Sequence, residues 1–403
     1  MDHAIDPAEP FAGGVASDEG EGALVAGAEI SRDLRRQPIA RRPTGFGRRL
    51  AGDANGKRLG LRRDFHHWSR MKKALALTLA LWPLVCSGAR AASPCDAPVH
   101  VEAPLAGPLQ PISRMTDYKI ALESCRREGA APVLATRTMR VDGEALFLAV
   151  DPEALTTRLE RAACWTCAPT TREAQASTRF MQSVERLAQA PGKTLPPGAT
   201  WLDNAGLVRG KGGGAFLTGD LCPSHRPLDR AFLQSLERPG AATPVALSIT
   251  GVWMQQHPQD FLWLRREKAE RRLAISFTNH SFHHPYRPGL ADAHNFLLVP
   301  GVDMHSEILD VERSLIANGE VPNAFFRFPG LISDKALMDS VREAFLIPLG
   351  ADAWLAITPK PPPPGAIILV HPNGNEPFGL NQFDHLSREN ALPQPFRPLE
   401  EAP

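Results

Sequence analysis

Three histidines stand within five positions of the segment SFTNHSFHHPY, residues 276–286. His280 and His284 are four residues apart, and on a helical turn this spacing puts two side chains on one face with Cβ atoms about 5–6 Å apart. Two imidazoles arranged in that way can bind one divalent ion at about 2.0–2.1 Å. A hydrogen-bonded polar loop can contain the same residues, so the pair alone is a weak signal. It raises a metal-site hypothesis that the rest of the chain must support.

The histidines follow one of several short apolar runs that alternate with helical patterns from residue 215 onward. This alternation is typical of βα units around a mainly parallel sheet. We expect strands at 215–218, 245–250, 273–277, 324–328, 346–349 and 366–370. We expect helices at 227–237, 260–271, 304–318 and 334–345. In such folds the functional groups collect beyond the carboxyl ends of the strands.

Polar or ionisable side chains follow most of these expected strands. They are Asp220 and Cys222 after the first strand, His280 and His284 after the third, Arg327 after the fourth, Asp352 and Trp354 after the fifth, and His371 and Glu376 after the sixth. If the strands are parallel, these side chains meet at one edge of the sheet. The pattern therefore predicts a site there.

In their order, these residues resemble the motifs of the polysaccharide deacetylases with the NodB homology domain, carbohydrate esterase family four. The family's motifs run TFDD, HSxxH, RxPY, DxxDW and LxH. In this chain they correspond to Thr218–Leu221, His280–His284, Arg327–Gly330, Asp352–Trp354 and Leu369–His371. The HSxxH match is the specific one, and the others add weight through their order. The resemblance covers residues 215–372 and none of 92–211.

The resemblance implies an α/β fold, a distorted (β/α) barrel of the NodB homology type, with an additional N-terminal accessory segment. It implies a divalent metal, zinc with cobalt or nickel as alternatives, that helps to remove N- or O-linked acetyl groups from a polysaccharide. His280 and His284 would bind the metal, Asp220 would be the catalytic base and a further candidate ligand, and His371 would be the general acid. Arg327 would orient the base. The resemblance and the neighbouring polar residues suggest these substrate-binding candidates: Trp354, Asp352, Pro329 and Asn375.

The chain also departs from the family's pattern. Leu221 stands where the family has a second, metal-binding aspartate, and Gly330 replaces a tyrosine, which removes an aromatic wall. Either Asp220 serves the metal and another group acts as base, or the site keeps an extra water or recruits one of His225, Asp229, His283 and Glu376. Cys222 lies in a turn beside the site, where its thiol could bind the metal, pair or pack.

These departures leave more than one function open. The favoured one is a metal-dependent acetyl hydrolase, and the alternative is a catalytically impaired glycan-binding relative of the deacetylases. A third is another acyl hydrolase on the same barrel. With a net charge of +1 over 403 residues, the chain has no global field that would attract nucleic acid or an anionic membrane.

The first part of the chain predicts export. Residues 1–70 lack apolar periodicity, so we expect them to be disordered or not part of the true protein. Residues 71–91 have two lysines, a short apolar run and a small-x-small cleavage site, which are typical of a secretory signal peptide. Cleavage after Ala91 would give a periplasmic or secreted protein without a stable membrane span. An uncleaved anchor is the alternative, and a twin-arginine signal at Arg62–Phe65 or a lipid anchor at Cys86 is disfavoured.

Residues 92–211 are expected to form an accessory domain of unknown role, with 212–380 as the deacetylase-like domain and 381–403 as a tail. A strand pair hinged at Asp142–Gly143 and helices at 152–163 and 172–190 are expected in the accessory domain. Its Cys164 and Cys167 form a CxxC motif that fits a redox motif, half of a zinc site or a local disulfide. We favour structural disulfide bonding, because an exported protein meets an oxidising compartment.

Overall fold

The computed structural model of the protein describes residues 94–403. The predictions for residues 1–70 and for the signal peptide at 71–91, with Cys86, lie outside the described residues. Among residues 94–403, no helix is both long and apolar enough to cross a membrane.

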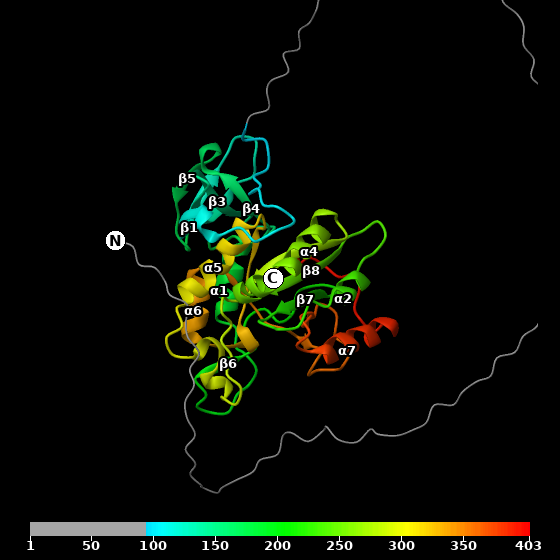
Figure 1. Ribbon diagram of the computed structural model, residues 1–403. Coiled ribbons are helices and arrows are strands. Elements are labelled where there is room, and N and C mark those ends of the chain that lie inside the picture. The colour runs from blue at the N-terminus through cyan, green and yellow to red at the C-terminus, as the bar shows by residue number, and fades with distance from the viewer. Residues whose placement is uncertain (1–93) are drawn as a thin grey trace, which may run out of the picture. The chain divides into compact units, whose positions relative to one another are not determined.

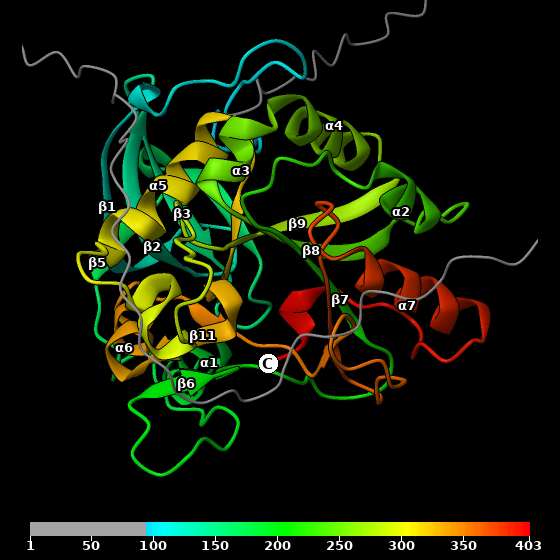
Figure 2. The ribbon, with the colours of Figure 1, turned by 60° about the horizontal axis from the view of Figure 1, so that its bottom comes forward.

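The elements follow one another along the described part of the chain as two sets of strands with interspersed helices (Figures 1 and 2). The strands are β1 (Met115–Arg126), β2 (Val133–Val141), β3 (Glu144–Val150), β4 (Thr157–Arg161), β5 (Thr166–Pro169), β6 (Trp201–Asp203), β7 (Phe216–Leu221), β8 (Thr243–Ile249), β9 (Leu273–Asn279), β10 (Pro322–Arg327), β11 (Ile332–Asp334), β12 (Ile347–Leu349), β13 (Ala353–Trp354) and β14 (Ile367–Val370). The α-helices are α1 (Arg179–Ala188), α2 (Arg230–Ser235), α3 (Gly251–Gln256), α4 (Pro258–Ala269), α5 (Met304–Ala317), α6 (Lys335–Glu343) and α7 (Pro377–Arg388).

The larger sheet is parallel throughout, in the order β12-β10-β9-β8-β7-β14-β13. Its two edge strands are consecutive in the chain, since β12 ends at Leu349 and β13 begins at Ala353. In a flat sheet, six spacings of about 4.8 Å would separate them by about 29 Å, but four residue steps reach at most about 14 Å. The sheet must therefore curl until its edges approach one another. This confirms the predicted distorted (β/α) barrel.

All six expected strands of the barrel are present, each within a few residues of its predicted ends. The buried runs of β7, β10 and β14 have no exposed position, as is typical of parallel strands covered on both faces. The four expected helices correspond to α2, α4, α5 and α6. The two-residue strand β13 and the helices α3 and α7 were not predicted.

The C-terminal residues pack against the barrel. Helix α7 begins before residue 380 and continues through the first part of the expected tail. Further on, Phe396 forms a parallel bridge with Ala215, and Ala402 is buried. The segment 381–403 is therefore part of the folded barrel region.

The second sheet is antiparallel, in the order β4-β3-β2-β1-β5. The predicted hairpin is confirmed: Asp142 and Gly143 join β2 to β3, and both have positive φ, 49° and 86°, as a two-residue type I′ turn requires. The helix predicted at 152–163 is wrong. Leu155 has a φ of 63°, which no right-handed helix can include, and β4 follows it as an edge strand.

The helix predicted at 172–190 forms only over its second half. Helix α1 begins after Thr178, whose side-chain oxygen accepts a hydrogen bond from the Met181 amide at 3.2 Å. This N-cap satisfies one of the amides that a helix start leaves without a partner. The preceding residues form turns.

Two disulfides cross-link the antiparallel sheet and its flanking segment. The CxxC cysteines are bonded to distant partners and not to each other: Cys164 to Cys95, and Cys167 to Cys125. The second bond follows from strand register, because β5 pairs with β1 so that Cys167 lies directly opposite Cys125. Within residues 94–403, Cys222 is the cysteine that remains free.

A buried ion pair joins the antiparallel sheet to helix α5. The Arg137 guanidinium on β2 donates to both carboxylate oxygens of Glu312 at 2.7 and 2.9 Å, and both side chains are about 1% exposed. Tyr118 of β1 donates its hydroxyl to the same carboxylate at 2.7 Å. Burial and the negative charge of Glu312 hold the pKa of Tyr118 well above its usual value. The hydroxyl therefore stays protonated and remains a donor.

We expect Arg137→Met to destabilise the protein strongly, by about 3–5 kcal/mol, because it leaves the buried Glu312 carboxylate without its positive partner. The free energy of unfolding, measured with denaturant in the absence of reductant, checks this. The matched control is Arg388→Met, whose partner Asp384 lies on the surface, and there we expect a change of at most about 1 kcal/mol. Equal losses in the two variants would contradict the assigned role of the buried pair.

Candidate functional site

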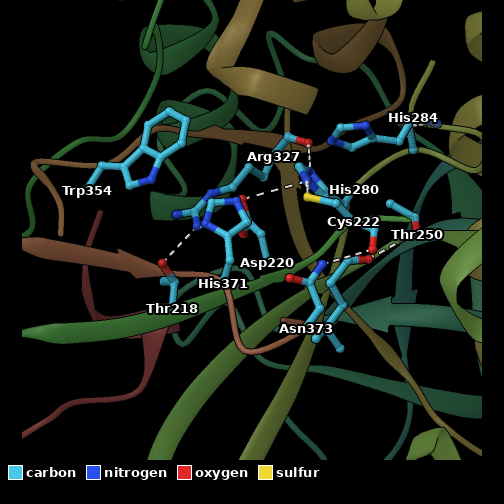
Figure 3. A network of polar contacts seen from close by, with 12 residues as sticks. Thr218, Asp220, Cys222, Thr250, His280, His284, Arg327, Trp354, His371 and Asn373 are labelled. Carbon is cyan, nitrogen blue, oxygen red and sulfur yellow. Dashed lines mark hydrogen bonds and ion pairs between the residues drawn. The ribbon is translucent and has the colours of Figure 1, made fainter. Parts of the chain in front are cut away.

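Four of the sequence-predicted residues come together at the carboxyl ends of neighbouring strands (Figure 3). Asp220 is near the end of β7, Arg327 ends β10, and His280 and His371 follow β9 and β14 directly. The four strands lie within five consecutive positions of the sheet. Parallel strand direction therefore collects side chains that are up to 151 residues apart in the sequence, as the pattern predicted.

A buried guanidinium fixes the carboxylate of the site. Arg327 is fully buried, and its Nη1 donates to Asp220 Oδ1 at 2.9 Å and to the Thr218 hydroxyl at 2.8 Å. Its Nη2 donates to the Gly350 carbonyl at 2.9 Å. Burial alone would raise the pKa of Asp220, but the charges of Arg327 and the nearby histidines outweigh it, and the pKa is lowered. Asp220 is therefore ionised at neutral pH.

The tautomer of His280 is set by a backbone carbonyl. Its ring is 1% exposed, and Nδ1 lies 2.8 Å from the Arg327 carbonyl oxygen. A carbonyl only accepts, so Nδ1 carries the proton. In the neutral ring, Nε2 is left with a lone pair, 3.5 Å from Cys222 Sγ and 3.6 Å from Asp220 Oδ2. Such a backbone contact is typical of histidines that bind metals.

His284 faces His280 from a loop and not from the helical turn considered above. Ser281 and His284 both have left-handed backbone angles, with φ of 65° and 48°, so the loop reverses sharply between the two histidines. Their ring centroids are 4.9 Å apart. The His284 ring is 9% exposed, and its Nε2 is buried without a hydrogen-bond partner. An unpaired buried nitrogen is costly, so this atom is poised for a ligand.

Glu307 of α5 holds this loop and was not predicted. One carboxylate oxygen accepts the backbone amides of Phe282 and His283 at 2.8 and 2.9 Å. The other lies 2.7 Å from His283 Nδ1. His283 thus points away from the other two histidines. A glutamate at the start of an expected helix gave no signal in the sequence, because the contact depends on how α5 packs beside the loop.

Cys222 joins the two histidines, whereas Leu221 does not. Alternation along β7 turns Leu221 into the apolar core, where it is fully buried, and brings Cys222 to the side that bears Asp220. One potential ligand atom from each of Cys222, His280 and His284 lies within 4.8 Å of the others. Asp220 is not a member of this group. Of the described residues, Glu123, Cys125 and Cys167 form a second such group, but its cysteines are disulfide-bonded.

The side chains considered as replacements for the second aspartate lie elsewhere. His225 is exposed, Asp229 accepts the Gly374 amide at 2.9 Å, and His283 pairs with Glu307. Glu376 pairs with His371. The thiol of Cys222 is the group that lies beside the histidines. Burial alone would raise its pKa, but His284 and the contact with His280 outweigh burial and hold the pKa well below its usual value.

His371 follows β14 and lies near both Asp220 and Cys222 (Figure 3). Its Nδ1 is 2.8 Å from Glu376 Oε2, an ion-pair distance at an angle that is poor for a hydrogen bond. Burial lowers the pKa of His371, but contacts with Cys222 and Glu376 together raise it to about 10. Trp354 packs against the ring at 5.5 Å between centroids and donates its indole N–H to Glu376 at 2.8 Å. His371 is therefore held as a protonated, oriented donor.

Part of this site opens into a cavity of about 580 Å³, while Asp220, Arg327 and His280 are buried behind its lining. Cys222, His284 and His371 line it together with Trp354 and Asn375. Of the expected substrate-binding residues, Trp354 and Asn375 thus reach the cavity.

Asp352 and Pro329 do not line this cavity. Asp352 pairs with Arg209 at 2.7 Å, whereas Arg327 pairs with Asp220. Pro329 is buried in the turn after β10. Asp352 and Pro329 themselves therefore contribute to the architecture beside the site.

The aromatic wall expected to be missing at Gly330 is supplied from another segment. A Cβ atom at Gly330 would lie 2.4 Å from the ring of Phe296, so the phenylalanine occupies that space. Tyr286 stacks on Phe296 at 5.3 Å between centroids, and both line the cavity. The expectation of a lost wall is therefore wrong, because a distant residue fills the gap.

No protein-family model matches the chain. Similar solved structures include a family 4 carbohydrate esterase from Streptomyces lividans, with 22% identity over 45% of this chain and 90% of that one and a TM-score of 0.31. A family 4 carbohydrate esterase from Bacillus anthracis has 19% identity over 49% and 87%, with a TM-score of 0.36. A family 4 pseudoenzyme from Bacillus anthracis has 16% identity over 47% and 66%, with a TM-score of 0.31. These proteins are of the family that the motifs resemble. At such low identities and TM-scores, the function must be argued from this chain's own side chains.

We expect Glu307→Ala to loosen the loop at 280–284, because the amides of Phe282 and His283 lose their acceptor. Hydrogen exchange of these two amides should become faster while the amides of β9 keep their protection. Asp310→Ala, on the same helix but paired with Arg313, is the control and should leave both amides unchanged. Unaltered exchange in the Glu307 variant would show that the carboxylate does not hold the loop.

Proposed function

We propose that the chain is a metal-dependent hydrolase that removes N- or O-linked acetyl groups from a polysaccharide of the cell envelope or the exterior. The observation that carries the proposal is the meeting of three kinds of group at the carboxyl ends of neighbouring strands, beside one cavity. They are an ionised carboxylate fixed by Arg327, two imidazoles facing each other, and a third imidazole, His371, paired with Glu376. Together they match the needs of acetyl hydrolysis.

The side chains fit a divalent ion. His284 Nε2 is buried with no partner, and the contact of His280 Nδ1 with a carbonyl leaves the lone pair of the neutral ring on Nε2, beside Cys222. His280 and His284 would hold the ion, for which we propose zinc with cobalt or nickel as alternatives. When bound, such an ion polarises an acyl carbonyl and makes a water more acidic.

In the proposed reaction Asp220 is the general base. Its ionised carboxylate takes a proton from the attacking water as the water oxygen bonds to the acetyl carbon. Arg327 is a positioning residue, since it holds Asp220 Oδ1 and keeps the carboxylate charged. The fixed orientation leaves Oδ2 as the oxygen that accepts the proton.

His371 is the proposed general acid. Its raised pKa keeps the ring protonated at neutral pH, so a proton is available for the leaving nitrogen or oxygen as its bond to the acetyl carbon breaks. The products are acetate and the free amine or alcohol of the sugar. Trp354, Tyr286 and Phe296 give the cavity apolar faces suited to sugar rings.

The proposal includes export, which the expected signal peptide motivates. The disulfides Cys95–Cys164 and Cys125–Cys167 support it, because such bonds persist in oxidising compartments. The substrate proposed here is accordingly outside the cytoplasm.

Leu221 motivates the alternative, a glycan-binding relative that has lost catalysis, because this residue replaces a metal-binding carboxylate. The two proposals differ in turnover. Acetate release from acetylated glycans and from a simple acetate ester distinguishes them, and bound glycan without acetate release would favour the alternative. Cleavage of the ester alone would favour another acyl hydrolase.

Asp220→Asn should lower kcat by about 10²–10⁴-fold, the usual contribution of a general base, because an amide cannot take the proton. Acetate release at saturating acetylated glycan is the measurement. Asp352→Asn, at a carboxylate that pairs with Arg209, should retain nearly full activity. Full activity of Asp220→Asn together with a loss of activity in Asp352→Asn would overturn the assignment of Asp220 as the base.

Removing metal with a chelator should abolish acetate release, and adding back zinc, cobalt or nickel should restore it. The same treatment of His284→Ala should give little activity at any stage, because one of the two imidazoles is lost. Metal content of the dialysed proteins provides the parallel measurement. Full activity of a protein shown to contain no metal would exclude the metal-dependent mechanism.

A further inference from the structure

The donors around the proposed metal position are two imidazoles and one sulfur. We propose that Cys222 is the third protein ligand, as a thiolate, and that it makes this a one-cysteine, two-histidine site for zinc. The inference rests on the proposed function, which assumes a metal between His280 and His284. It goes further because it assigns a ligand of a different chemical class to the position that the family's second aspartate holds.

Distance supports this assignment. Cys222 Sγ lies 3.5 Å from His280 Nε2. Zinc bonds of about 2.3 Å to sulfur and 2.0–2.1 Å to nitrogen, at a tetrahedral angle, place those two atoms about 3.6 Å apart. The pair is thus already separated as two ligands of one ion would be. The third donor, on His284, lies within 4.8 Å of both.

The third donor provides an independent sign of a ligand. His284 Nε2 is buried and has no hydrogen-bond partner, although its ring faces His280 (Figure 3). A positive ion bonded to the three donors would satisfy this nitrogen. A hydrogen bond between Cys222 and His280 alone would leave it orphaned.

Strand geometry explains why the ligand is Cys222 and not Leu221. Side chains alternate along β7, so Asp220 and Cys222 face the site and Leu221 faces the core. The polypeptide therefore presents a donor two residues after Asp220. The Cys222 carbonyl accepts from the Asn373 side chain at 2.9 Å, which fixes the backbone at this position.

The assignment also frees Asp220 from metal binding. Asp220 Oδ1 is engaged by Arg327, and the carboxylate is not part of the three-donor group. A thiolate carries the same charge of −1 as the missing carboxylate, so the total charge of the ligand set is preserved. Sulfur is softer than oxygen, so the site should favour zinc or cobalt over manganese or magnesium.

Cobalt substitution tests the proposal, since a sulfur ligand gives Co²⁺ a charge-transfer absorption in the near ultraviolet. The full chain is stripped of metal without reductant and titrated with cobalt chloride. We expect the wild-type protein to show this band with one bound cobalt, and Cys222→Asp to bind cobalt without it. Cys222→Ala should weaken zinc affinity by more than the ~10–100-fold typical of an outer-shell loss. Near-ultraviolet circular dichroism establishes that the variants are folded.

His225→Ala is the control, because this imidazole is exposed and is not one of the three donors. It should keep the band. Zinc should also protect Cys222 from iodoacetamide in the wild-type protein, as judged by peptide mass spectrometry.

Cobalt bound to the wild-type protein without the band, or a band that persists in Cys222→Asp, would overturn the ligand assignment while leaving the proposed hydrolase intact. An acetyl group recovered on Cys222 after incubation with substrate would identify the thiol as a nucleophile and also overturn it. A folded wild-type protein that binds neither cobalt nor zinc would overturn both this inference and the metal-dependent function.

Discussion

The site depends on one buried charge. Arg327 is completely enclosed, and a guanidinium removed from water is tolerated only when it is paired and hydrogen-bonded. Its partners come from β7 and from the turn after β12. In the sheet these two strands lie on opposite sides of β9, so the hydrogen bonds of Arg327 connect both parts of the sheet. The contact that stabilises the barrel is therefore the contact that orients the carboxylate. The hydrogen bonds of Arg327 thus serve both the stability of the fold and the orientation of Asp220.

Much of the barrel could be predicted from the sequence because its signals are local. Short apolar runs gave six strands, and the rule that side chains gather at parallel strand ends placed Asp220, His280, Arg327 and His371 together. The accessory region was harder. The helix expected at 152–163 failed because the apolar spacing of Leu155 and Leu159 fits more than one structure, and the backbone angle of Leu155 decided between them.

The parts of the site that sequence reasoning missed depend on tertiary packing. Phe296 fills the space beside Gly330 from more than thirty residues away, and Glu307 reaches the loop through the position of α5. Neither contact has a sequence signature. Cys222 is different, since a period of two along the expected strand would have turned it toward Asp220. From the sequence its thiol is one of several possible ligands, beside Asp220, an extra water and four other side chains.

Helix α5 bears two buried carboxylates five residues apart, about 7.5 Å along its axis. Glu312 is held by Arg137 of the antiparallel sheet, and Glu307 holds the histidine loop. The sheet before residue 170, although it supplies no group to the cavity, is thus connected to the loop through one rigid helix. A chimaera in which another protein's sheet replaces this one would therefore need a guanidinium positioned to pair with Glu312. Without it, helix α5 would shift and the two histidines would lose their alignment.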